Sequence, residues 1–387
     1  MSRFALPRIG SCHAFTQMFL CLVALIATLG ASTACLAAKN TASSLPPVHH
    51  VFIIMLENEA YTITFGQNSL APYLAHDLPK QGALLPNYYG IGHSSLDNYV
   101  AMISGQAPNT ATQNDCETYS EFVPSAAKPD ENGQLAGTGC IYPKSVDTLA
   151  NQLTAAGLTW KAYMEDMGAD PSRESATCGH VAIGADDPTR HATPNDQYAA
   201  KHNPFVYFHS IIDGKTYCDT HVVNLSALNN DLAHINTTPN YVYITPNLCH
   251  DGHDAPCKNG EKGGLISANT FLQTWVPRIL NSPAFKKDGL LIITFDEGTA
   301  GDACCNEQPL PGGPQPGQFG PGGGQIGAVL LSPFIKPGTT STVSYNHYSL
   351  LRTLEDIFGL KHLGYAGADS LRPLGSDVFT AHPGPHH

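Results

Sequence analysis

The sequence predicts an α/β fold, a three-layer α/β/α sandwich around a mostly parallel central sheet. Segments with apolar residues at helical spacing separate short apolar runs along the chain. Strands that alternate with helices favour parallel pairing, because each helix carries the chain back to the starting edge of the sheet. Three of the apolar runs contain no charged residue, as is typical of strands buried on both faces, and they span residues 51–56, 241–244 and 290–295.

The remaining elements follow in order along the chain. Residues 145–156 predict a helix, because Val146, Leu149 and Leu153 share one face and Gly157 can end it. By similar criteria, further strands are expected at residues 83–89, 158–163 and 326–331, and further helices at residues 69–80, 96–104, 265–280 and 348–358.

Connections rich in Gly and Pro separate these elements. With 36 Gly and 29 Pro, the chain must contain long loop segments. We expect a single domain over residues 48–375, followed by a disordered tail over residues 376–387. Loop insertions in this domain are expected at about residues 106–143, 167–240 and 299–325.

The first 38 residues have the pattern of a signal peptide. Arg3 and Arg8 precede an apolar run over residues 19–29, and small residues follow it. The apolar run is too short for a comfortable membrane span. We therefore expect a secreted or periplasmic protein after cleavage. Lipoprotein anchoring at Cys35 is an alternative, although the usual Leu three residues earlier is missing.

Cysteine usage agrees with export. Of 11 Cys, 3 lie in or beside the signal, which leaves an even number, as expected for disulfide bonds in an exported chain. Cys304 and Cys305 could bond to each other or pair elsewhere. A zinc–thiolate site is the competing interpretation, but the chain has no Cys-x-x-Cys pair. Proximity in the sequence suggests the pairs Cys116–Cys140, Cys178–Cys218 and Cys249–Cys257.

The charge balance limits the possible partners. A formal net charge of −12 argues against duplex DNA or an anionic membrane as the main partner. We expect no nucleic-acid partner, no stable membrane span and a monomer. Several of the 18 His lie in loops beside Asp or Asn, which fits a metal or phosphate centre better than a core.

Clusters of polar ligands recur after the predicted strands. Glu57 and Asn58 directly follow the first buried run, and Asp296 and Glu297 directly follow the run at residues 290–295. Buried carboxylates at the carboxyl edge of a sheet are unfavourable unless they bind a cation or a phosphate-bearing centre. Further clusters of this kind lie at residues 93–95, 202–204 and 250–254.

Together these clusters predict phosphoryl transfer. Carboxylate, amide and imidazole groups suit a divalent cation such as Mg²⁺, Mn²⁺, Ca²⁺ or Zn²⁺. A Ser at a strand-to-helix turn lies where the helix N-terminus stabilises an anion, and metal coordination would make its hydroxyl a nucleophile. Taken singly, Asn58 or Ser95 is more often a cap, and Asp296 and Glu297 could solvate a strand end. The recurrence of such clusters after strands of one sheet favours the catalytic interpretation.

Other hydrolase motifs are absent from the sequence. Residues 92–96 begin like a nucleophile elbow but have Leu96 where Gly is needed. The chain also lacks the Asp-x-Asp motif of aspartyl phosphatases, an Arg-His-Gly motif, and the Cys-x-Pro-x-Arg motif of sulfatases.

Five segments of the chain have the pattern of known motifs, and they span residues 51–58, 93–99, 201–205, 294–298 and 348–356. Together they resemble one phosphoesterase family, which contains bacterial phospholipases C and secreted acid phosphatases and belongs to the alkaline-phosphatase superfamily. The resemblance implies an alkaline-phosphatase-like form of the predicted fold. It covers about residues 48–360 and is closest to the short secreted acid phosphatases, some of which dephosphorylate phosphatidylinositol 3-phosphate.

The resemblance also implies roles for individual residues. Ser95 would be the nucleophile, but Asp97 stands where the family usually has Pro, so Ser94 remains an alternative. His93, His202 and His253 would hold phosphate or protonate the leaving oxygen. By the matched motifs, Glu57, Asn58, Asp296 and Glu297 would be metal ligands. The polar cluster at residues 250–254 adds Asp251 as an expected metal ligand, and the expected substrate-binding residues are Ser94, Asn98, Lys201 and His250.

The predicted function is an exported, metal-dependent acid phosphatase that forms a phosphoserine intermediate. Its partner would be a phosphate-ester small molecule or a phospholipid head group, and phosphoinositides are among the candidate substrates. Residues 298–302 replace the Gly-Gly-Phe-Tyr-Asp-His-like run of the phospholipases, which weakens the first alternative, a phospholipase C-type phosphodiesterase. The second alternative is a catalytically silent secreted binding protein.

Overall fold

An eight-stranded sheet forms the centre of the computed structural model, which describes residues 45–380. The strand order is β11-β2-β10-β9-β1-β8-β6-β7, and β10 alone runs antiparallel to its two neighbours. The strands of this sheet are β1 (His50–Leu56), β2 (Ala83–Leu85), β6 (Trp160–Met164), β7 (Val222–Asn224), β8 (Tyr241–Thr245), β9 (Gly289–Phe295), β10 (Ala328–Leu331) and β11 (Thr339–Thr340).

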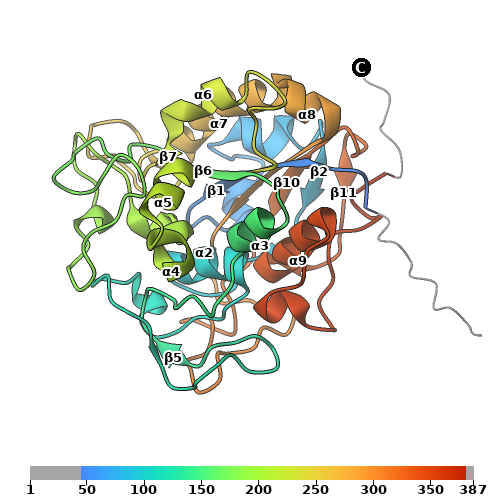
Figure 1. Cartoon of the computed structure of the whole chain (residues 1–387). Helices are drawn as coiled ribbons and strands as arrows, with labels where there is room; N and C mark the ends of the chain where they lie inside the picture. The colour runs from blue at the N-terminus through green and yellow to red at the C-terminus, as the bar shows by residue number, and fades with distance from the viewer. Residues whose placement is uncertain (1–44, 381–387) are drawn as a thin grey trace, which may run out of the picture. The chain divides into compact units, whose positions relative to one another are not determined.

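Helices cover both faces of the sheet, which confirms the predicted three-layer α/β/α architecture (Figure 1). On one face lie α6 (Leu228–Asp231), α7 (Gly264–Asn281) and α8 (Pro283–Asp288). On the other lie α2 (Ser95–Ser104), α3 (Leu149–Ala155) and α9 (His347–Phe358). The short helices are α1 (Tyr61–Thr64), α4 (His209–Ile212) and α5 (Lys215–His221).

Smaller elements lie in the connections. Two two-stranded sheets pair β3 (Tyr88–Tyr89) with β12 (Tyr345–Asn346), and β4 (Val123–Pro124) with β5 (Gly137–Thr138). The 3₁₀ turns are Thr112–Asn114, Pro188–Arg190, Ala200–His202, Pro204–Tyr207, Leu225–Ala227 and Gly364–Gly367.

The two innermost strands bring the predicted ligand pairs together. Every residue of β1 and β9 is buried, as their apolar sequences predict. The strands are parallel, and their register pairs Leu56 with Phe295. Glu57 and Asp296, the next residue on each strand, therefore lie at the same edge of the sheet. The backbone ladder extends to them, because the Asp296 amide donates to the Leu56 carbonyl over 2.9 Å.

Three local predictions need correction. The helix expected at residues 69–80 is only a short π-helix, Tyr73–Asp77, because Pro72 and Pro79 restrict the chain on either side. The helix expected from residue 145 begins at Leu149, where the Thr148 side chain forms a capping box with Asn151. The tail is packed as far as Thr380, since Val378 and Phe379 are buried.

Within the described part of the chain, four disulfide bonds join cysteines that are between 1 and 40 residues apart in the sequence. Three are the predicted pairs, and the fourth joins the adjacent Cys304 and Cys305. Within residues 45–380, no helix has both the length and the apolar character needed to cross a bilayer. The predicted signal peptide at residues 1–38, Cys35 and the tail after residue 380 lie outside the described residues.

Candidate active site

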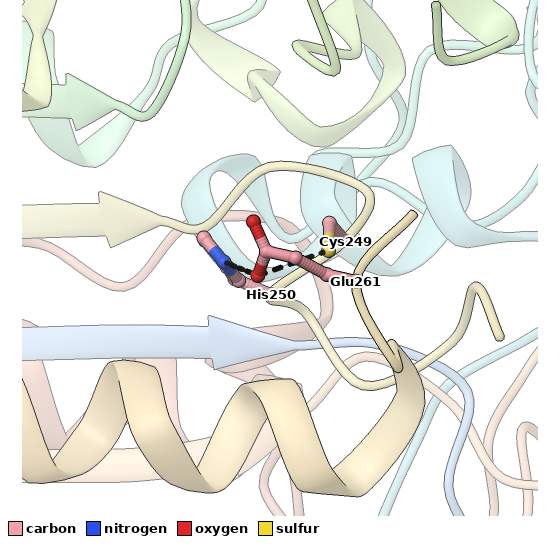
Figure 2. Close-up of side chains that lie close together, drawn as sticks. All are labelled: Cys249, His250 and Glu261. Atoms are coloured by element: carbon pink, nitrogen blue, oxygen red, sulfur yellow. Dashed lines mark hydrogen bonds and ion pairs between the residues drawn. The ribbon is translucent and has the colours of Figure 1, made fainter. Parts of the chain in front are cut away.

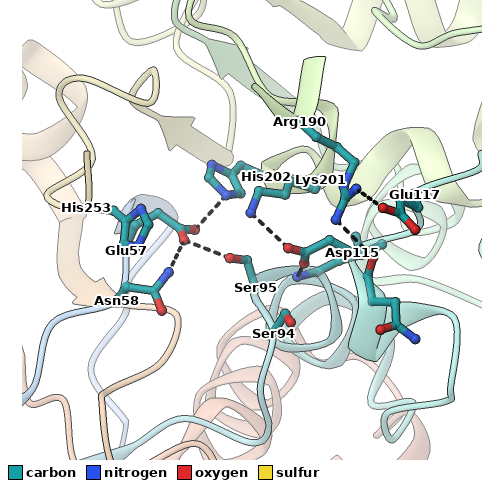
Figure 3. Close-up of polar contacts among 12 residues, drawn as sticks. Glu57, Asn58, Ser94, Ser95, Asp115, Glu117, Arg190, Lys201, His202 and His253 are labelled. Atoms are coloured by element: carbon teal, nitrogen blue, oxygen red, sulfur yellow. Dashed lines mark hydrogen bonds and ion pairs between the residues drawn. The ribbon is translucent and has the colours of Figure 1, made fainter. Parts of the chain in front are cut away.

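Glu57 lies in the middle of a buried group of polar side chains at the carboxyl edge of the sheet (Figure 3). We call this group the buried polar centre. The Glu57 side chain is only 1% exposed. Glu57 Oε1 accepts a hydrogen bond from the Tyr99 hydroxyl over 2.6 Å. Glu57 Oε2 accepts hydrogen bonds from Ser95 Oγ over 2.9 Å and from Asn58 Nδ2 over 3.0 Å. The carboxylate therefore joins the end of β1 to helix α2.

Ser95 is the first residue of α2 and is buried. Ser95 and Tyr99 are four residues apart, so they share the helix face that meets Glu57. The position of Ser95 at the helix N-terminus favours an anion next to its oxygen. Its neighbour Ser94 points elsewhere, because Ser94 Oγ donates to the Gln113 carbonyl over 3.2 Å. The structure thus brings Ser95, rather than Ser94, against the carboxylate.

Asp296 and Glu297 directly follow β9 and line the centre beside the end of β1. Asp296 Oδ1 accepts hydrogen bonds from the backbone amides of Asn58 over 2.9 Å and Glu297 over 2.6 Å. Asp296 Oδ2 and Glu297 Oε2 are buried and have no hydrogen-bond partner among the described residues. His93 Nε2 lies 3.9 Å from Glu297 Oε2 and 3.1 Å from the Gly298 carbonyl.

Asp251 and His202 complete the centre on the side of β8. The Glu57 amide donates to the Asp251 carbonyl over 2.8 Å, which ties the loop after β8 to the end of β1. His202 Nε2 lies 3.3 Å from Glu57 Oε1, and His202 Nδ1 lies 3.7 Å from Asp251 Oδ2. The His202 ring stacks on Tyr99 at 5.3 Å between ring centroids. His253 lies at the rim, where its amide donates to Asp251 Oδ1 over 3.0 Å.

Burial dominates the electrostatics of these groups. It raises the pKa of Asp251 to about 7 and the pKa of Asp296 to about 6. Burial, followed by repulsion from Asp296, raises the pKa values of Glu57 and Glu297 well above their usual range. Burial also lowers the pKa of His202 well below its usual range, and the nearby Lys201 charge lowers it further. The largest cause of the raised carboxylate pKa values and of the lowered His202 pKa is the same, because ions are poorly solvated in this buried centre.

The donor set fits a divalent cation. Glu57, Asp251, Asp296 and Glu297 are all buried, and the last three each have one oxygen with no hydrogen-bond partner within residues 45–380. Buried carboxylates at such density are unfavourable unless positive charge balances them. Oxygen and imidazole donors of this kind suit Mg²⁺, Mn²⁺, Ca²⁺ or Zn²⁺. The five residues that could hold the ion are Glu57, Asn58, Asp251, Asp296 and Glu297.

Lys201 supplies a positive charge beside the centre, but that charge is already paired. Lys201 Nζ lies 2.9 Å from Asp115 Oδ2. Burial alone would lower the pKa of Lys201, but the carboxylates of Asp115 and Glu57 raise it, so the side chain stays charged. Asp115 Oδ1 also accepts the Leu96 amide over 3.0 Å, at the N-terminus of the helix that begins with Ser95.

Several residues of the buried polar centre were not predicted from the sequence. Tyr99 could have been found from its spacing of four residues after Ser95 on a predicted helix. Asp97 is buried, and neither of its oxygens has a hydrogen-bond partner in the described chain. His347, at the start of α9, donates to the Asp296 carbonyl over 2.6 Å. Asp115 and His347 approach only through tertiary folding, and no local pattern signals them.

Two of the expected substrate-binding residues are engaged differently. Asn98 holds the turn before α2, since its Oδ1 accepts the Ile91 and Gly92 amides and its Nδ2 donates to the Gly92 carbonyl. His250 lies in a separate network, 3.0 Å from Glu165 and 3.2 Å from Glu261 (Figure 2). The structure does not bring His250 to the group around Glu57.

Two clusters elsewhere contain the side-chain types of a metal site but no free cysteine to bind a metal. One consists of Cys249, His250 and Glu261 (Figure 2), and the other of Cys304, Cys305 and Glu307. All their cysteines are in disulfide bonds, so neither cluster offers a thiolate, which is the form that binds a metal. The buried carboxylate centre around Glu57 is therefore the better candidate for a cation.

Comparison with known proteins gives a consistent match over most of the chain. The sequence profile of the phosphoesterase family matches residues 67–361. A probable acid phosphatase of Kluyveromyces lactis is 26% identical over 323 residues, which cover 82% of this chain and 60% of the relative. A phosphate-repressible acid phosphatase of Penicillium chrysogenum is 27% identical over 339 residues, which cover 85% of this chain and 65% of the relative. The chain thus spans about three fifths of the length of these fungal relatives.

A shorter relative matches over most of both chains. A phosphatidylinositol-3-phosphatase of Mycobacterium tuberculosis is 26% identical over 329 residues, which cover 84% of this chain and 82% of the relative. Among solved structures, a protein in the alkaline phosphatase superfamily from Vibrio parahaemolyticus aligns with a TM-score of 0.45 and 13% identity, over 87% of this chain and 73% of its own.

Proposed function

The chain belongs to the phosphoesterase family, and from that premise we propose that it is a secreted, metal-dependent phosphomonoesterase of the acid phosphatase type. The observation that carries this proposal is the contact between Ser95 and Glu57. A serine hydroxyl at a helix N-terminus, 2.9 Å from a buried carboxylate, is an arrangement suited to phosphoryl transfer. Relatives named acid phosphatase and phosphatidylinositol-3-phosphatase support the same reaction class.

In the proposed reaction, Ser95 Oγ forms a bond to phosphorus while the bond from phosphorus to the alcohol oxygen breaks. Glu57 Oε2 accepts the hydrogen bond from the Ser95 hydroxyl, which orients Ser95 and allows the carboxylate to take up the hydroxyl proton as the bond to phosphorus forms. The leaving alcohol oxygen takes up a proton, and His253 is the candidate donor because it lies at the rim of the centre and pairs with Asp254 at 3.0 Å. Water then attacks phosphorus and gives a proton to His253, while the bond from phosphorus to Ser95 Oγ breaks. Ser95 Oγ takes back its proton from Glu57, and phosphate is released.

Other residues would hold the phosphate during these steps. His202, kept neutral by burial, can donate one hydrogen bond to a phosphate oxygen. His93 precedes Ser95 by two residues, and the charged Lys201 pairs with Asp115, which accepts the Leu96 amide next to Ser95. Both side chains are candidates to bind further phosphate oxygens. The α2 N-terminus adds a favourable field for the anion. These groups bind and orient the phosphate, while Ser95 forms the covalent bond.

A divalent cation bound by Glu57, Asn58, Asp251, Asp296 and Glu297 would neutralise the carboxylates and stabilise negative charge on the reacting oxygens. The buried oxygens of Asp251, Asp296 and Glu297 that have no partner in the described chain support this part of the proposal. Export to an oxidising compartment is supported by the four disulfide bonds. The proposed partner is a phosphate monoester, either a small molecule or a lipid head group.

The test compares two chromogenic substrates of the purified, oxidised protein. We expect p-nitrophenyl phosphate to be hydrolysed much faster than bis(p-nitrophenyl) phosphate, and treatment with a chelator to abolish the activity. Restoring Mg²⁺, Mn²⁺, Ca²⁺ or Zn²⁺ one at a time identifies the metal. A strong preference for the diester would overturn the monoesterase proposal in favour of a phosphodiesterase. Equal inactivity of wild type and Ser95→Ala on both substrates would indicate a binding protein.

A further inference from the structure

An apolar groove opens beside the rim of the candidate active site. Its volume is about 280 Å³, and Gly252 and His253 form part of its lining. Three large aliphatic side chains from separate segments also line it: Ile63 in α1, Leu70 before the π-helix, and Ile266 in the first turn of α7. The groove therefore depends on the tertiary fold and is not a feature of one loop.

These three side chains are unusually exposed. Their exposed fractions are 56% for Ile63, 62% for Leu70 and 36% for Ile266. They are three of the seven large apolar side chains that are exposed within residues 45–380. Single exposed apolar residues need no explanation, whereas several around one groove indicate a binding surface. An apolar ligand would remove them from water, which is favourable.

The groove adjoins the buried centre at two of its lining residues, Gly252 and His253. Gly252 follows Asp251, whose carbonyl accepts the Glu57 amide. A Cβ at Gly252 would lie 3.4 Å from the Glu57 carbonyl oxygen, so this part of the groove lies against the strand end that holds the carboxylate. His253, the candidate proton donor to the leaving alcohol, lines both the groove and the rim. The alcohol side of a bound ester would therefore face the groove.

We propose that this groove binds the apolar part of the alcohol in the phosphate ester, so that the preferred substrates are monoesters of alkyl or aryl alcohols. The inference rests on the proposed phosphomonoesterase function and adds its substrate class. Sugar or polyol phosphates without an apolar chain gain nothing from Ile63, Leu70 and Ile266. Glu59 and Lys262 also line the groove and can meet polar groups at the end of a short chain.

The test uses a series of linear alkyl phosphates from ethyl to hexyl, all below their aggregation limit. Each methylene buried in the groove should raise kcat/KM about threefold to fourfold, until the groove is full. The double variant Leu70→Ser/Ile266→Ser should flatten this dependence on chain length. The control variant Val123→Ser removes an aliphatic side chain that is 66% exposed on β4 and lines no part of the groove, so it should keep the wild-type slope.

Binding measurements separate the groove from the reaction. The dissociation constants of non-hydrolysable alkyl phosphonates should fall with chain length for wild type and not for the double variant. If the phosphonates show this slope but no phosphate monoester is hydrolysed, the groove is supported and the proposed reaction is wrong. If monoesters are hydrolysed at rates independent of chain length and the phosphonates show no slope, the groove proposal is overturned while the phosphatase stands. A third outcome is that kcat/KM does not depend on chain length and that wild type, but not the double variant, binds phosphatidylcholine vesicles. This outcome would overturn the groove proposal in favour of a membrane contact.

Discussion

Lys201 and Asp115 form an ion pair of 2.9 Å beside the helix that begins with Ser95. The second carboxylate oxygen of Asp115 accepts the Leu96 amide, so one side chain holds both the N-terminus of α2 and the lysine. The pair thereby links the position of the proposed nucleophile to the position of a proposed phosphate-binding charge. Both side chains are largely buried, which strengthens the charge-assisted bond between them.

Asp115→Asn should weaken substrate binding more than it slows the chemical step. The amide oxygen can still accept the Leu96 amide, but the charge that orients Lys201 is lost. We expect KM for p-nitrophenyl phosphate to rise about tenfold, which corresponds to about 1.4 kcal/mol, with a smaller change in kcat. Glu117→Gln is the matched control, because it removes the exposed pair with Arg190 two residues away and should leave KM unchanged. Equal losses of kcat in both variants would contradict a positioning role.

Glu57→Gln should lower metal affinity and activity together while the fold is retained. The amide keeps the size of the side chain but removes the charge to which Tyr99, Ser95 and Asn58 donate. We expect metal affinity, measured by calorimetric titration of the chelator-treated protein, to fall at least tenfold. Tyr99→Phe removes one hydrogen bond to the same carboxylate and should have a smaller effect. Wild-type metal affinity in Glu57→Gln would show that this carboxylate is not a ligand.

Glu355 predicts a pH dependence of stability that is independent of the candidate site. It lies in α9 with 0% exposure, and burial raises its pKa to about 9. Between its unfolded pKa near 4.5 and this value, the folded state holds a proton that the unfolded state has released, so stability falls as pH rises. Arg352 and Asp356 are the charged groups that also act on it.

Glu355→Gln should remove this loss of stability. The variant can still accept the Leu363 amide, which Glu355 Oε1 accepts over 2.8 Å. In urea unfolding, we expect a stabilisation of about 1–3 kcal/mol at pH 8 and almost none at pH 4. The loop variant Glu131→Gln, at an exposed carboxylate, should change stability by less than about 0.5 kcal/mol at both values. An equal effect of Glu355→Gln at pH 4 and pH 8 would contradict a raised pKa.

The parts of this centre that the sequence predicts lie at strand ends. The apolar runs of β1 and β9 indicate buried parallel strands, and parallel strands carry their following residues to one edge. The sequence therefore predicted that Glu57 and Asp296 lie at one edge of the sheet, whereas the pairing of β1 with β9 that makes them neighbours comes from the structure. Ser95 could be placed there as well, because the turn before a helix lies at the same edge. The disulfide pairs were predictable because the cysteines are close in the sequence.

The parts that the sequence does not predict depend on contacts between distant loops. His250 was expected beside Asp251, but Glu165, 85 residues away in the chain, holds it in another network. Asp115 pairs with Lys201, which is 86 residues away in the sequence, and no periodic pattern predicts such a contact. The helix expected at residues 69–80 was limited by two prolines that outweigh the apolar spacing. Long loops thus set the details of a centre whose location the strands determine.

The identity of the phosphorylated residue decides whether Ser95 is the nucleophile. Excess wild-type protein, loaded with its metal, is mixed with p-nitrophenyl phosphate and quenched in acid within milliseconds, and its peptides are analysed by mass spectrometry. We expect one phosphoryl group on Ser95, retained at wild-type level in Ser94→Ala and absent in Ser95→Ala. A phosphoryl group on Ser94 or on a histidine, or a burst of p-nitrophenol with an unmodified Ser95, would contradict this expectation.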